Sequence, residues 1–128
     1  MKVPSKGNRI DIAPGVRFVE RNRTVGPVFF LEALTEPECK TVVMDGEECL
    51  QYEWTAKDLE SGRIVGYIVT EKWLHYGPAL FQGYKDSERY WFGRRSREEI
   101  AREMEFCKDN NLLKTLDEYD RLSREFNV

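Results

Sequence analysis

The stretch KTVVMDGEECLQYEWT, residues 40–55, contains the strongest local structural signal in the chain. Its Asp45-Gly46 pair readily adopts positive φ at both central positions of a tight turn, which matches the twist of two paired strands. Polar and apolar residues alternate after the turn, and the apolar residues of the second strand share one face: Leu50, Tyr52 and Trp54. Period-2 alternation is typical of a half-buried strand. The stretch therefore predicts an antiparallel hairpin with one face toward a core.

More short strands are predicted on both sides of this hairpin. They cover residues 16–19, 27–34, 63–70 and 79–81. Arg21-Asn22-Arg23 reads as a polar loop between the first two of them. Residues 63–70 are apolar on both faces, which is typical of a strand that is central in a sheet or strongly bent.

Together these segments predict an α+β fold with five or six short strands. A small antiparallel barrel of the SH3-like kind is the economical arrangement, because closure removes exposed edge strands. A strongly bent open sheet covered by C-terminal helices is the alternative. We expect one domain, 1–128, with four parts: an irregular lead-in (1–15), a β-rich body (16–82), a connector (83–95) and a helical part (96–128). Within the lead-in, the alternation of Ile10 and Ile12 allows a short strand as an alternative.

Two capping boxes predict two short helices in the last part. In each, a hydroxyl residue is followed three positions later by glutamate, Ser96 with Glu99 and Thr115 with Glu118. The apolar stripe of the first helix comprises Ile100, Met104 and Cys107, and that of the second comprises Tyr119, Leu122 and Phe126. Asn110-Asn111 is expected to end the first helix. A homodimer through the helices is a further prediction, with candidate residues Leu112, Leu113 and Leu116.

The composition limits the classes of partner and the compartment. The net charge is -3, so the chain has no global positive field that would attract nucleic acid or an anionic membrane. The odd number of cysteines and the absence of a CxxC motif favour a reducing compartment, although Cys39 and Cys49 flank the hairpin and can approach each other across it. The N-terminus lacks the apolar stretch of a signal peptide. We therefore expect a cytoplasmic protein, in the host cytoplasm if the source is viral.

The sequence offers little for catalysis. His75 is the single histidine, and no metal-ligand spacing or glycine-rich phosphate loop is present. No catalytic residue, metal or cofactor is predicted, and a small enzyme is the third and weakest hypothesis.

The connector and the start of the first helix have the highest density of recognition chemistry. The candidate ligand-binding residues are Arg89, Tyr90, Trp91, Arg94, Arg95 and Arg97, with Arg63 from a strand and Arg21 and Arg23 from a loop as further contributors. Aromatic rings stack on bases, guanidinium groups bind phosphate, and a helix N-terminus favours anions. The first hypothesis is therefore a non-catalytic protein that binds a nucleotide or nucleic acid. In the structural alternative, the rings fix the connector and the arginines pair with nearby glutamates.

The second hypothesis is a protein–protein interaction module or inhibitor. Small barrels often bind through aromatic-lined grooves, and Trp54, Trp73 and Tyr76 are candidate anchors for a partner. An acidic surface suits a basic partner, such as a nucleic-acid enzyme whose channel is blocked. A small acidic chain of this kind is also typical of a phage-type accessory or counter-defence protein.

Overall fold

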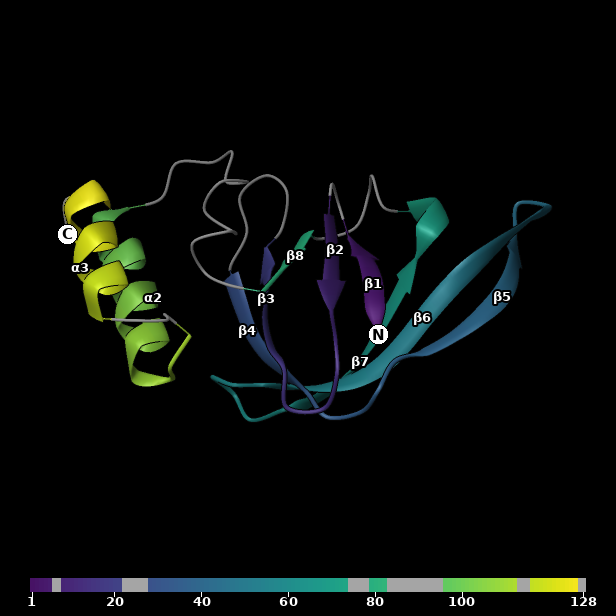
Figure 1. Ribbon diagram of the computed structural model, residues 1–128, viewed down its shortest axis with the longest axis horizontal. Coiled ribbons are helices and arrows are strands. Elements are labelled where there is room, and N and C mark those ends of the chain that lie inside the picture. Colours follow the sequence, from purple (N-terminus) through teal and green to yellow (C-terminus); the bar gives the residue numbers. More distant parts are fainter. Residues whose placement is uncertain (6–7, 22–27, 74–78, 83–95, 113–115, 127–128) are drawn as a thin grey trace.

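The computed structural model describes residues 1–5, 8–21, 28–73, 79–82, 96–112 and 116–126. In chain order the elements are β1 (Lys2–Ser5), β2 (Asn8–Asp11), β3 (Arg17–Arg21), β4 (Val28–Ala33), β5 (Glu38–Met44), β6 (Glu47–Asp58), β7 (Ile64–Thr70), the 3₁₀ turn η1 (Glu71–Trp73), β8 (Ala79–Phe81), α2 (Arg97–Asp109) and α3 (Leu116–Phe126). A curled antiparallel sheet makes up most of the fold, and the two helices pack at one end of it (Figure 1). The predicted α+β class and the bent sheet are therefore confirmed.

The predicted hairpin is β5–β6, and its turn has the expected geometry. Asp45 and Gly46 have φ values of 51° and 79°, and Met44 pairs with Glu47 across the turn. The second strand is longer than predicted, because β6 continues to Asp58.

β6 organises the six-stranded sheet, because it pairs with three other strands. Residues 47–53 pair with β5, residues 56–58 pair with β4, and residues 51–57 pair with β7. β4 pairs in turn with β3, and β3 with β8. The sheet curls into a half-barrel (Figure 1), and β5, β7 and β8 are its edge strands in the described part of the chain.

Of the two arrangements expected for the strand over residues 63–70, central or strongly bent, the central one is wrong. Within the described part of the chain, β7 pairs with β6 alone and forms an edge of the sheet. Its alternate residues Val65, Tyr67 and Val69 pack against the core, whereas Ile64 and Ile68 face solvent. The second apolar face is therefore not covered by any described element.

The lead-in over residues 1–15 contains more regular structure than the short strand considered at Ile10 and Ile12, because β1 and β2 pair as a second hairpin. Val3 and Ile10 face each other in this pair and are buried with Ile12. The hairpin fills the inside of the curl, where its side chains join Tyr52 and Trp54 in one core cluster. Ser5 links this hairpin to the edge strand β8, since the Ser5 Oγ accepts a hydrogen bond of 2.7 Å from the Leu80 N–H.

The helices cover the other face of the sheet only where it is formed by β3, β4 and β8. Ser96 caps α2 as predicted, with its Oγ accepting from the Glu99 N–H at 3.1 Å. The predicted stripe of α2 is buried together with Leu122 of α3, and Asn111, with a φ of 56°, follows the end of α2. The second capping residue, Thr115, lies outside the described residues, and none of the helices described is both long and apolar enough to span a membrane.

We expect the two adjacent phenylalanines of β4 to differ sharply in their contribution to stability. Phe30 is 1% exposed and its ring lies 4.8 Å from that of Phe106 in α2, whereas Phe29 points to the other face and is 40% exposed. Phe30→Ala should lower the free energy of unfolding by about 3–5 kcal/mol, because it leaves a cavity in a packed core. Phe29→Ala should cost about 1 kcal/mol or less. Urea titration followed by tryptophan fluorescence measures both, and equal losses would contradict the assignment of the two faces.

Candidate functional site

Most of the predicted ligand-binding segment cannot be placed. Arg89, Tyr90, Trp91, Arg94 and Arg95 lie outside the described residues. The same holds for the predicted partner anchor Tyr76, and only the backbone of Trp73 is described, in η1. The phosphate-binding function assigned to residues 83–97 therefore stays a prediction.

Arg23 also lies outside the described residues, and the other three arginines of that prediction lie at three different places in the chain's fold. Arg97 is exposed in the first turn of α2, and Arg63 is exposed in the turn between β6 and β7. Arg21 is not in a loop: it is the last residue of β3, is 2% exposed, and faces the helix side of the sheet beside Val28 and Ala79.

Trp54 is a core residue, so it is not a surface anchor for a partner. It is 3% exposed and stacks on Tyr67, with ring centroids 5.3 Å apart. Phe18 packs edge-on against both rings, at 6.0 Å from Trp54 and 5.5 Å from Tyr67. Edge-to-face and offset stacking are the favoured geometries for aromatic pairs. This cluster holds the inner face of β7 against β3.

Glu20 lies at the end of this aromatic cluster, and sequence analysis did not select it. It stands on β3 two residues after Phe18, on the same inner face, and its carboxylate accepts a hydrogen bond from the Tyr67 hydroxyl. The register places it between Phe29 of β4 and Leu80 of β8. This hydrogen bond thus connects β3 to the edge strand β7, which is not its neighbour in the sheet.

The surroundings of Glu20 disfavour its charge. Burial among apolar side chains raises its pKa from 4.5 to about 7, and the negative charge of Asp58 at the end of β6 adds to the effect. Within the described part of the chain, no lysine or arginine forms an ion pair with Glu20. A carboxyl with such a raised pKa at a partly open site is a candidate for function.

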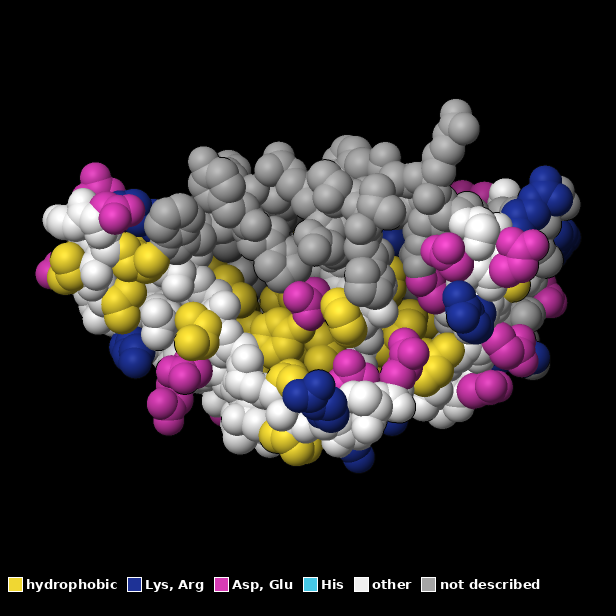
Figure 2. Space-filling view, turned by 180° about the vertical axis from the view of Figure 1, so that it is seen from behind, with side chains coloured by type: hydrophobic (Ala, Val, Ile, Leu, Met, Phe, Trp, Pro, Cys, Tyr) yellow, Lys and Arg dark blue, Asp and Glu magenta, His cyan; other side chains and the backbone are white. Residues whose placement is uncertain are grey.

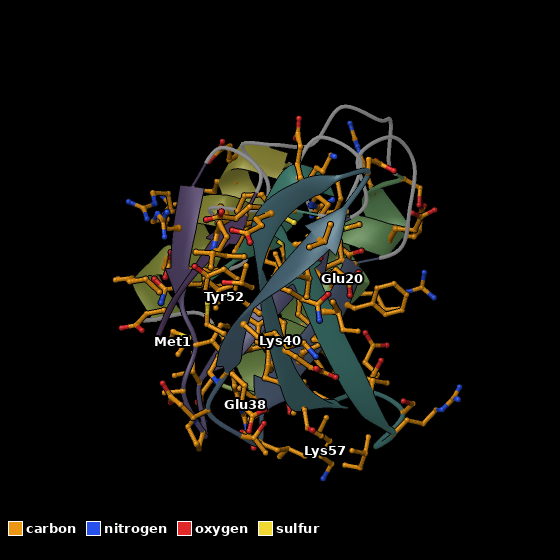
Figure 3. All side chains as sticks on the ribbon, turned by 90° about the vertical axis from the view of Figure 1, so that its right-hand side faces the viewer. Met1, Glu20, Glu38, Lys40, Tyr52 and Lys57 are labelled. Atoms are coloured by element: carbon orange, nitrogen blue, oxygen red, sulfur yellow. The ribbon has the colours of Figure 1, made fainter. Side chains whose placement is uncertain are left out.

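A second polar group lies at another place on the inner face. The Tyr52 hydroxyl contacts the Cys39 thiol and the Arg9 guanidinium, and burial raises its pKa. Figure 3 shows Tyr52 and Glu20 well separated behind β5. The pairing of Cys39 with Tyr52, and of Cys49 with Val42, places the two cysteines on opposite faces of the hairpin, and both are free thiols. These two cysteines therefore do not approach each other across the hairpin.

The outer face and the edge of β7 form an exposed apolar strand surface. Its sequence, IVGYIVT, has no charged residue and no proline. Ile64 and Ile68 are 60% and 59% exposed. Figure 2 shows further hydrophobic side chains across the middle of the surface, with acidic side chains standing among them. We call the β7 edge, with these two isoleucines and Tyr67, the β7 site.

Negative charge concentrates in the segment of the chain that contains β7. Residues 38–72, which form β5, β6, β7 and η1, contain eight acidic and four basic residues, so they carry a net charge of -4. Since the whole chain has a net charge of -3, the remainder is slightly basic. The chain is therefore acidic chiefly in the part that presents the exposed strand.

No match was found for this chain among protein-family models, curated proteins or solved structures. In the described residues, no group of three or more His, Cys, Asp or Glu is arranged to hold a metal ion. The site is therefore interpreted from its own geometry.

We expect Glu20→Gln to change the pH dependence of stability. With a native pKa of about 7 against 4.5 when unfolded, native Glu20 binds more protons between these values, so stability is fully present below about pH 4.5 and is lost as pH rises through 7. Glutamine stays neutral and still accepts from Tyr67. The variant should match the native protein at pH 5 and exceed it by about 1–3 kcal/mol at pH 8 in urea unfolding. Glu53→Gln, at an exposed position of β6, is the control, and parallel pH profiles for native and Glu20→Gln proteins would contradict the raised pKa.

Proposed function

We propose that the protein is a non-catalytic protein-binding module, which captures an extended basic segment of a partner protein as an additional strand on β7. The observation that carries this proposal is an uncharged seven-residue edge strand with two exposed isoleucines. Unpaired backbone N–H and C=O groups along a sheet edge template the addition of another strand.

The other two edges differ from β7 in ways that disfavour strand addition. β5 has Glu38 and Lys40 along it, and charged side chains are a common protection of sheet edges. β8 has only three residues, all of them buried. β7 has no charged residue and is seven residues long, which supports β7 as the docking edge.

Charge supports a basic partner rather than a second copy of the chain. The net charge of -4 on residues 38–72 would oppose self-association through this part and would attract lysine and arginine. Blocking the basic groove of a nucleic-acid enzyme is one inhibitory action open to such a module. SH3-like barrels also bind extended segments, and an SH3-like class for the half-barrel is part of the same proposal. Binding of a phosphate-bearing ligand by residues 83–97 stays a separate prediction.

The probe for this function is an acetylated heptapeptide with arginine at the fourth position, valine at the third and fifth, and threonine elsewhere. We expect it to slow hydrogen exchange of backbone amides in β7 and not in β5, because only the added strand protects the free edge. Mass-spectrometric exchange measures this directly. Protection confined to β5, or none at saturating peptide, would contradict the proposal.

The matched variants add the same charge to either edge strand. Ile64→Lys with Ile68→Lys should weaken peptide binding about tenfold or more, because it removes exposed apolar surface and repels the basic peptide. Thr41→Lys with Val43→Lys, which also adds two charges at exposed positions, should have a much smaller effect. Fluorescence anisotropy of a labelled peptide compares the two, and equal losses would indicate only general charge attraction.

A further inference from the structure

A strand added to β7 would present its side chains alternately to the two faces of the sheet. Residues directly opposite each other in paired strands share a face. The position opposite Tyr67 therefore faces inward, toward the open side of the curl, while the positions before and after it face outward beside Gly66 and Ile68. The inward position is the one that meets Glu20, because the Tyr67 hydroxyl already contacts that carboxylate.

We propose that Glu20, Tyr67 and Phe29 form a subsite for one lysine or arginine side chain of the docked strand, at the position opposite Tyr67. This subsite rests on the proposed strand addition and gives it sequence selectivity. The expected ligand pattern is an inward basic residue between two outward apolar residues.

The chemistry of Glu20 favours binding of a cationic side chain. The carboxyl group is desolvated by Phe29, Leu80 and the aromatic cluster, and no described lysine or arginine neutralises it. Asp58 adds a second negative charge from β6, and Tyr67 supplies a neutral hydroxyl from β7. A partner's ammonium or guanidinium group would supply the missing positive charge, and charge-assisted hydrogen bonds are the stronger class.

Phe29 adds an apolar contact to the charge of Glu20 in the subsite. Its ring stands directly across from Glu20 in the β3–β4 register and is substantially exposed. Cations bind over aromatic faces, and the apolar stem of lysine or arginine packs on such rings. The side chain that we infer therefore has an apolar contact for its stem and an anionic contact for its head.

The test compares the arginine heptapeptide with the same peptide carrying citrulline, which has nearly the same shape but lacks the charge and has an acceptor oxygen in place of one donor nitrogen. The native protein should prefer arginine about tenfold at pH 8, by anisotropy. Affinity for the arginine peptide should fall about tenfold from pH 8 to pH 5.5, because protonation removes the Glu20 charge. Glu20→Gln should bind both peptides alike at both pH values.

The controls separate this subsite from the strand addition itself. Glu53→Gln makes the same charge change on the outer face beside Ile68 and should keep the arginine preference. If both peptides protect β7 from exchange but Glu20→Gln keeps the full arginine preference, the subsite is wrong and the strand addition stands. If neither peptide protects β7, the proposed function fails first.

Discussion

The structure depends on the pairing of one long strand with three others. β6 has twelve residues, and its two edges together pair with β5, β4 and β7. A strand of this length carries the right-handed twist of a sheet through a large angle, so the strands at its two ends cannot be coplanar. The curl that follows creates an inside, which the β1–β2 hairpin and the aromatic cluster fill. In the described part of the chain it also leaves β7 with a free edge, and Glu20 of β3 accepts a hydrogen bond from Tyr67 of this strand.

Local signals were sufficient for the parts of the fold that depend on local geometry. Asp45-Gly46 predicted its turn and Ser96 predicted the start of α2, because both act through neighbouring backbone groups. The position of β7 at an edge depends on which strands pair far along the chain, and the alternation within residues 63–70 contains no such information. For the same reason Arg21 was assigned to a loop, since the pairing that extends β3 to this residue comes from β4 and β8.

The candidate site was missed for a related reason. Glu20 looks like any polar residue that alternates with apolar ones, and its importance comes from Phe29, Leu80 and Tyr67, which three different strands bring to it. One signal in the sequence did point to the region: the strand over residues 63–70 is apolar on both faces. A strand of this kind is either covered on both sides within the fold or available to something outside it. The structure supports the second case for Ile64 and Ile68.

The energetics of such a surface explain why an apolar strand edge and a buried carboxyl are useful together. Complete burial of an isoleucine contributes about 1.5–3 kcal/mol, and both side chains here are already partly covered, so the two add about 2–4 kcal/mol when a partner covers them. That free energy, together with backbone pairing, is consistent with modest affinity. Backbone pairing discriminates poorly among extended peptides, because every peptide has the same backbone. Selectivity must then come from side chains on the inner face, where a wrong residue leaves a desolvated carboxyl without a partner. In the proposed complex, Glu20 would impose such a penalty from the inner face, and only while it is ionised.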